Sequence, residues 1–225
     1  MDYNKLRKNI ANENYLRQTG FKKENPSYAE ESISIKKSFL IICEGENTEP
    51  KYFEYFPVPT NTIITEGGCN SKTSLVNYAL EIKDKDRYAD REVWCVFDYD
   101  LKPDEFLTQP EDFNNAIKKA EAKGMKVAWS NDAFELWFVL HYQQLDSHVT
   151  RAELNSILKK QWDLSDYANN AKTQKFCLEH YKRHGGHESE MQKLAIIRAK
   201  KLHESFEGRQ DFSKHCPCTT VYLLV

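Results

Sequence analysis

Carboxylate side chains stand after two apolar runs of the sequence. Glu44 follows residues 39–43 (FLIIC), and Asp98 and Asp100 follow residues 93–97 (VWCVF). Alternation along an extended segment points Asp98 and Asp100 the same way, and their oxygens are hard ligands that suit Mg²⁺ or Mn²⁺. Without a cation, two carboxylates about 4 Å apart would repel by about 4 kcal/mol at an effective dielectric constant of about 20, which favours protonation or metal capture. The alternative for each residue alone is a solvated acid at the start of a loop.

Segments that predict strands alternate with segments that predict helices. Apolar runs predict strands at residues 39–43, 63–65, 93–97 and 126–129. Helices are expected at residues 49–56, 71–85, 111–123 and 131–145. This alternation predicts an α/β fold, in which right-handed crossovers build a mainly parallel sheet flanked by helices on both faces. Because functional groups gather where loops leave the carboxyl ends of such strands, we expect Glu44, Asp98 and Asp100 to meet there.

The length of the chain suits one compact domain with a smaller helical region added to it. The chain has 225 residues, of which 40% are hydrophobic and 29% charged, with 8 Gly and 7 Pro. This composition excludes a collagen-like chain and argues against wholesale disorder. We expect a polar N-terminal arm at residues 1–37, a catalytic core at residues 38–145 and a helical C-terminal region at residues 146–225. This last region would pack on the core and end in a strand at residues 219–225.

The lengths of the apolar runs and the positions of the cysteines indicate the cellular compartment in which the protein is expected. No run approaches the roughly 20 apolar residues that cross a bilayer, and a polar stretch follows Met1, so we expect a cytoplasmic protein without a membrane span. The chain has six cysteines, but Cys43 and Cys95 lie inside apolar runs like small buried hydrophobic residues. We therefore expect reduced thiols and no disulfide scaffold.

The formal net charge of −2 conceals an uneven distribution of charge. Residues 81–135 hold 9 Lys and Arg against 14 Asp and Glu, a balance of −5. Residues 159–215 hold 12 against 8, and residues 1–38 hold 8 against 5, so both flanks are basic. Basic surface around an acidic centre suits a metal-dependent enzyme whose substrate is a polyanion. Ordinary mixed surface charge explains these counts about as well.

Four segments resemble the RloB-like proteins, a bacterial group with a Toprim-type fold found in restriction and phage-defence loci. They are FLIICEGENTEPKYFEYF (39–56), CVFDYD (95–100), SNDAFELWFVLHY (130–142) and PCTTVYLLV (217–225). Toprim domains of topoisomerases, primases and OLD-type nucleases use a Glu after the first strand and a DxD motif after a later one, which match Glu44, Asp98 and Asp100. The resemblance implies a Toprim-like core in which Asp98 and Asp100 hold Mg²⁺ or Mn²⁺. Glu44 would bind metal or act as a general acid or base.

The same resemblance implies roles for three further residues. Glu49 matches the EGxxTE pattern and would bind a second metal, although an acid is favoured in a first helical turn anyway. Glu135 matches FELW and would be catalytic or bind metal, although a capping box with Asp132 would explain it without a function. Lys172 would neutralise a phosphate or leaving group, as a lysine does in OLD-type nucleases; a solvated helical lysine is the alternative.

Two other sets of residues are weaker candidates for a functional site. Residues 67–73 (GGCNSKT) resemble a phosphate-binding loop, but Ser71 stands where the Walker pattern requires Gly, which argues against ATP binding. The backbone N–H groups at the start of the following helix remain candidates for contacting a substrate phosphate. A zinc site has possible ligands that match no standard closed arrangement, so surface histidines are the favoured explanation. These possible ligands are Cys177, His180, His184, His187, Cys216 and Cys218.

Together these features predict a metal-dependent nucleic-acid phosphodiesterase, a nuclease effector of bacterial antiphage defence that acts on DNA or on RNA such as tRNA. The sequence shows no ATPase loop, and the resemblance to defence loci suggests control by a partner ATPase of the RloA or OLD kind. Homo-oligomers remain possible. The alternative is a regulatory subunit that binds metal or nucleic acid without hydrolysis.

Overall fold

The computed structural model of the chain describes residues 38–55, 62–65, 71–100, 108–171, 173, 175, 176, 179 and 189–225. The expected N-terminal arm, residues 1–37, lies outside these residues. Residues 37–225 form one compact unit. None of the described helices combines the length and apolar character that crossing a bilayer requires.

A five-stranded sheet organises the fold, with the strand order β2-β1-β3-β4-β5. The strands are β1 (Phe39–Cys43), β2 (Thr62–Thr65), β3 (Glu92–Asp98), β4 (Lys126–Asn131) and β5 (Cys218–Thr219). The first four are parallel, and β5 pairs with β4 in the antiparallel direction. Helices separate the parallel strands along the chain, as right-handed crossovers require. The structure thus confirms the predicted α/β class with a mainly parallel sheet, and it agrees with a Toprim-like core.

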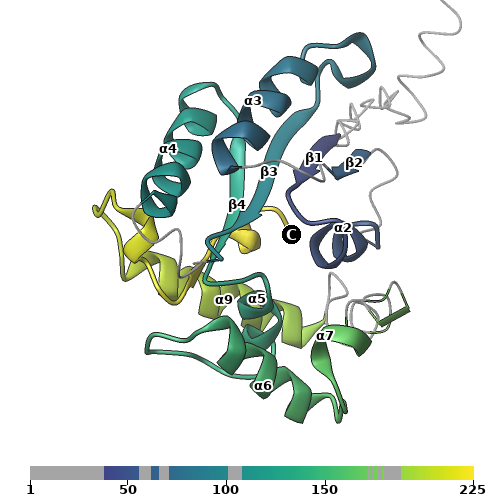
Figure 1. The fold of residues 1–225 in the computed structure, drawn as a ribbon, viewed down its shortest axis with the longest axis vertical. Helices are drawn as coiled ribbons and strands as arrows, with labels where there is room; N and C mark the ends of the chain where they lie inside the picture. Colours follow the sequence, from purple (N-terminus) through teal and green to yellow (C-terminus); the bar gives the residue numbers. More distant parts are fainter. Residues whose placement is uncertain are drawn as a thin grey trace, which may run out of the picture. The chain divides into compact units, whose positions relative to one another are not determined.

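Helices cover both faces of the sheet (Figure 1). The α-helices are α2 (Thr48–Phe53), α3 (Lys72–Ile82), α4 (Gln109–Ala122), α5 (Glu135–Leu140), α6 (Arg151–Gln161), α7 (Tyr167–Asn170) and α9 (Glu190–Glu204). The 3₁₀ helices are η1 (Asp86–Tyr88), η4 (Phe212–Lys214) and η5 (Val221–Leu223). Leu40 and Ile42 of β1 pack in one core with α3 and α4, whereas Ile41 and Cys43 pack in the other with α2, α5 and α9. Alternation along a strand that is buried on both faces explains the continuous apolar run.

The C-terminal segment differs from its expected form. A strand was expected over residues 219–225, but β5 ends at Thr219 and η5 follows. The Thr220 hydroxyl accepts a hydrogen bond from the backbone N–H of Trp129 at 2.9 Å and donates one to the carbonyl of Val127 at 3.1 Å. Because this side chain satisfies the backbone of β4, the chain turns away there instead of continuing the ladder.

Candidate functional site

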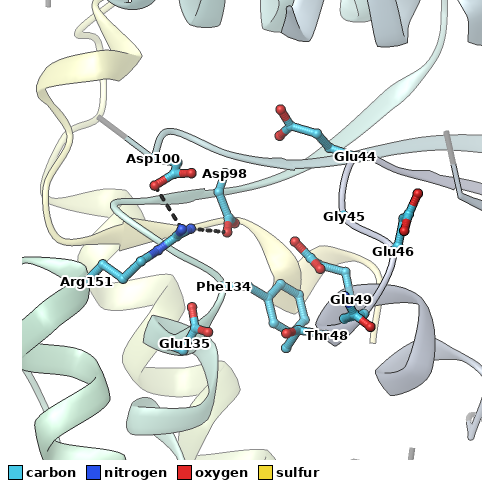
Figure 2. A pocket seen from close by; sticks show the side chains of 11 residues that line it. Glu44, Gly45, Glu46, Thr48, Glu49, Asp98, Asp100, Phe134, Glu135 and Arg151 are labelled. Atoms are coloured by element: carbon cyan, nitrogen blue, oxygen red, sulfur yellow. Dashed lines mark hydrogen bonds and ion pairs between the residues drawn. The ribbon is translucent and has the colours of Figure 1, made fainter. Parts of the chain in front are cut away.

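A polar pocket opens where β1 and β3 end and where α5 and α6 begin (Figure 2). Its volume is about 280 Å³. A water molecule takes about 30 Å³, so the pocket has room for a hydrated cation. The pocket lies at the carboxyl ends of parallel strands, the edge that the sequence predicts for the functional groups. Its lining residues are Glu44, Gly45, Glu46, Asn47, Thr48, Glu49, Asp98, Asp100, Phe134, Glu135 and Arg151.

Glu49 reaches the pocket from the first turn of α2. Its side chain is buried, with 8% of the residue exposed. A Cβ atom at Gly45 would lie only 2.6 Å from Glu49 Oε2, so the carboxylate lies directly over the backbone of the loop that follows β1. Gly45 therefore leaves space for the Glu49 carboxylate in its present position, and any larger residue would displace that carboxylate.

Asp98 and Asp100 enter the pocket from the end of β3. Asp98 is only 6% exposed, and its Oδ1 atom is buried without a hydrogen-bond partner among the residues that the structure describes. The backbone N–H of Asp100 donates to the carbonyl of Asp132 at 2.9 Å. Asp100 has a φ of +45°, a left-handed conformation that is uncommon outside glycine and that turns the chain out of the strand. Asp98 is thus held inside the pocket and Asp100 at its margin.

Glu135 is the first residue of α5 and is 3% exposed. The residue directly before α5 is Phe134, and it makes no side-chain cap hydrogen bond. The Asp132 carboxylate instead accepts a hydrogen bond from the backbone N–H of Arg151 at 3.1 Å. Glu135 Oε1 accepts a hydrogen bond from the Tyr167 hydroxyl at 3.4 Å. The Glu135 carboxylate is thus a buried member of the pocket lining, in contact with a tyrosine of α7.

Arg151 is a member of the site that the sequence did not predict. Its Nη2 lies 3.2 Å from Asp98 Oδ2, and its Nη1 lies 2.8 Å from Asp100 Oδ1, so one guanidinium bridges the two aspartates (Figure 2). The residue opens α6, whose start is fixed by a capping box between Thr150 and Glu153. The Thr-x-x-Glu pattern could have located this helix start, but nothing in it indicates the partners of Arg151.

The buried groups strongly perturb one another's protonation. Burial raises the pKa of Glu49 from 4.5 to about 7, and repulsion from Glu135 and Glu44 adds to that effect. Burial, followed by repulsion from Glu49, raises the pKa of Asp98 well above its ordinary value, although Arg151 opposes the shift. Burial alone would lower the pKa of Arg151, but the surrounding carboxylates, Asp98 foremost, raise it further above its ordinary value. The site thus holds more buried negative charge than Arg151 alone compensates.

Glu44 is at the rim and has a cationic partner of its own. Lys72 Nζ donates to both carboxylate oxygens of Glu44, at 2.5 and 2.7 Å. Lys72 is 7% exposed, and Figure 2 shows the Glu44 carboxylate turned away from that of Glu49. The backbone N–H groups of Lys72 and Thr73 donate to Asp112 at 2.7 and 3.2 Å. The expectation that these amides could contact a phosphate is therefore wrong, because a carboxylate of α4 already takes them.

The chemistry of the donor set fits a hard divalent cation. Carboxylates are the ligands that Mg²⁺ and Mn²⁺ prefer, and the buried Asp98 Oδ1 lacks a partner among the described residues. Yet within the described part of the chain no three His, Cys, Asp or Glu side chains form a ready metal site. Arg151 occupies one oxygen of Asp98 and one oxygen of Asp100, and Lys72 occupies both oxygens of Glu44.

Several predicted residues lie outside the part of the chain that the structure describes. They are Lys172 and the possible zinc ligands Cys177, His180, His184 and His187. The other two possible zinc ligands, Cys216 and Cys218, are described and are free thiols, as are Cys43 and Cys95.

Comparison with known proteins agrees with the motifs. No curated protein and no solved structure matches the chain. A family model described as RloB-like protein matches residues 39–225, which cover β1, β3, the pocket and everything after them. The match spans most of the 225 residues and confirms the resemblance carried by the four sequence segments. The chain therefore belongs to the RloB-like protein family.

Proposed function

We propose that the chain is a Mg²⁺- or Mn²⁺-dependent phosphodiesterase that cleaves nucleic acid as an effector of antiphage defence. The observation that carries the proposal is the convergence of three buried carboxylates, from Glu49, Asp98 and Glu135, at the carboxyl end of the parallel sheet. Three carboxylates that share one guanidinium are seldom buried together for structural reasons alone, because each loses hydration and repels its neighbours. Binding of a cation would offset this unfavourable free energy, which explains why the three carboxylates are buried together.

The charge of the pocket supports a cation-dependent reaction on a polyanion. Six carboxylates and one guanidinium line it among the described residues. A phosphodiester would be repelled from such a surface unless a cation stood between them. The basic segments on either side of the acidic middle of the sequence favour a long polyanion such as DNA or RNA.

Each carboxylate is assigned a task by its position. Asp98, Asp100 and Glu49 would hold the divalent cation, which supplies Lewis-acid activation and charge neutralisation when bound. Glu135 would accept the proton of the attacking water, since its carboxylate lines the pocket and is oriented by a hydrogen bond from the Tyr167 hydroxyl. Glu44, held by Lys72 at the rim, would orient the substrate or join the cation when that pair opens.

A partner ATPase of the RloA or OLD kind is part of this proposal, because defence nucleases need control and residues 67–73 lack the Walker glycine before Lys72. A second function, a regulatory subunit that binds metal or nucleic acid without hydrolysis, is favoured by one observation. Arg151 neutralises both aspartates of the DxD motif, and a site that never hydrolyses could remain in that state.

Cleavage assays separate these functions. The full chain is incubated with plasmid, single-stranded DNA and total tRNA, with Mg²⁺, Mn²⁺ or EDTA, in the presence and absence of a purified ATPase of the RloA or OLD kind. We expect cleavage of one polymer that needs the divalent cation and is lost in Asp98→Asn, while Glu81→Gln, an exposed control on α3 outside the pocket lining, cleaves normally. Cleavage that continues in EDTA or in Asp98→Asn would refute the nuclease assignment, and binding without cleavage in every mixture would favour the regulatory subunit.

A further inference from the structure

Arg151 holds the two aspartates that the proposed function assigns to a divalent cation. Its two terminal nitrogens contact one carboxylate each, at 3.2 Å from Asp98 Oδ2 and 2.8 Å from Asp100 Oδ1. This differs from the bidentate pair in which both nitrogens contact one carboxylate, the strongest geometry that a guanidinium offers. A cation that takes the same two oxygens must displace the guanidinium.

The ion pair leaves polar atoms unsatisfied on both sides. Asp98 Oδ1 and Arg151 Nε are buried, and neither has a hydrogen-bond partner in the described part of the chain. An unpaired buried donor or acceptor has lost its hydration without gaining a hydrogen bond in return, which is unfavourable. A divalent cation would satisfy the aspartate better, and a phosphate, with several acceptor oxygens, would satisfy the planar donor set of the guanidinium better. Each group thus has a better partner than the one it holds.

The backbone of Arg151 is fixed while its side chain has room to move. The capping box of Thr150 and Glu153 sets the start of α6, and the backbone N–H of Arg151 donates to Asp132. These contacts do not involve the guanidinium. The side chain is 33% exposed, compared with 9% for that of Asp98, so part of it already reaches solvent. Rotation of the side chain toward the opening therefore needs no unfolding of the helix.

We propose that Arg151 is an exchangeable counter-cation. It neutralises Asp98 and Asp100 in the metal-free protein; when a divalent cation takes their oxygens, the released guanidinium binds the phosphate of the substrate. The inference rests on the proposed function, because it requires cation binding by these aspartates. It gives Arg151 two successive partners, and it explains why the DxD motif is ion-paired in a chain that carries the residues of a metal-dependent site.

Manganese binding tests the first half of the exchange without any measurement of activity. Free Mn²⁺ is followed by electron paramagnetic resonance during titration of the full chain. Arg151→Gln removes the competing cation, and we expect its dissociation constant for Mn²⁺ to fall about tenfold, which corresponds to about 1.4 kcal/mol. Arg151→Lys keeps the charge but cannot bridge two carboxylates with a fork, so its constant should lie between the two. Lys160→Gln removes an equal charge from an exposed position of the same helix and should bind like the parent.

Single-turnover cleavage at saturating Mn²⁺ tests the second half. Although it binds the metal more tightly, Arg151→Gln should cleave at least about 100-fold more slowly, because a donor to the phosphate is lost. Thermal melting of each variant verifies that it is folded. Equal or weaker Mn²⁺ binding by folded Arg151→Gln would overturn the exchange and leave the proposed function intact. Tighter binding with undiminished cleavage would overturn the phosphate contact, and a parent that binds no Mn²⁺ would overturn the proposed function and this inference together.

Discussion

The replacement Glu49→Gln measures the electrostatic cost of building the pocket. Burial, with repulsion from Glu135 and Glu44, raises the pKa of Glu49 from 4.5 to about 7. Gln has nearly the same shape, and its carbonyl oxygen can still accept the hydrogen bond that the backbone N–H of residue 49 donates. The substitution therefore removes the charge and keeps the packing. In the metal-free protein we expect it to be stabilising.

The pH dependence of this gain follows from the raised pKa. At low pH the carboxyl is protonated in both the folded and the unfolded chain, so charge makes no difference. As the pH rises above about 4.5, the unfolded chain releases the proton while the folded protein retains it, and the folded state loses stability until the pH passes about 7. The difference between the two pKa values corresponds to about 3 kcal/mol above neutral pH and about 1 kcal/mol near pH 5.5. The Glu49→Gln variant should not lose this stability as the pH rises, because Gln has no proton to release.

Urea unfolding in EDTA, followed by tryptophan fluorescence, measures the difference, since Trp94 and Trp137 are buried and report on the core. Glu46→Gln makes the same chemical change at an exposed position of the same loop and should stay within about 0.5 kcal/mol of the parent. The reasoning fails if Glu49→Gln is no more stable than the parent near pH 8, or if its gain is the same at every pH.

Three further outcomes are expected. Gly45→Ala should weaken Mn²⁺ binding about tenfold or more with little change in circular dichroism, because the new Cβ displaces the Glu49 carboxylate; unaltered binding would remove Glu49 from the ligand set. Glu135→Gln should melt near the parent temperature, since Gln keeps the size of the side chain and an oxygen that can accept from Tyr167, yet cleave about 100-fold more slowly, and full activity would exclude a role in catalysis. His215 is 2% exposed, neither ring nitrogen has a partner among the described residues, and burial lowers its pKa. Below about pH 6.5 the unfolded chain takes up a proton that the folded protein resists, so the parent should lose stability relative to His215→Phe as the pH falls, and parallel curves would contradict this.

The sheet could be predicted from the sequence because its signal is local. Residues 39–43 form β1 as predicted, and the run at residues 93–97 extends by one residue at each end to form β3. A parallel strand buried on both faces needs an unbroken apolar run, and the end of that run marks where the strand meets the site. The prediction of a strand over residues 219–225 was wrong because of a long-range contact. The Thr220 hydroxyl forms hydrogen bonds with residues of β4, which lie far earlier in the chain.

The candidate site could be predicted in part. Glu49, Asp98 and Glu135 lie in the pocket, as the order of strands and motifs indicated. Lys172 lies outside the described residues. Glu44 lines the same pocket, but its carboxylate forms an ion pair with Lys72, and no motif in the sequence predicts that contact. Asp132 was considered only as a cap for the helix that follows it, and its hydrogen bond from the first residue of α6 could not be predicted from the local sequence.

By itself, the sequence determined which strands carry acids and at which edge of the sheet those acids gather. Only the tertiary structure decided their electrostatic partners. Arg151 is 53 residues away from Asp98, and Lys72 is 28 residues away from Glu44. Strand and helix patterns arise from neighbours in the chain, whereas the partner of a buried charge depends on which distant element packs over it. Because a carboxylate removed from water must be paired, protonated or bound to a cation, the partner that packs beside it determines its charge state.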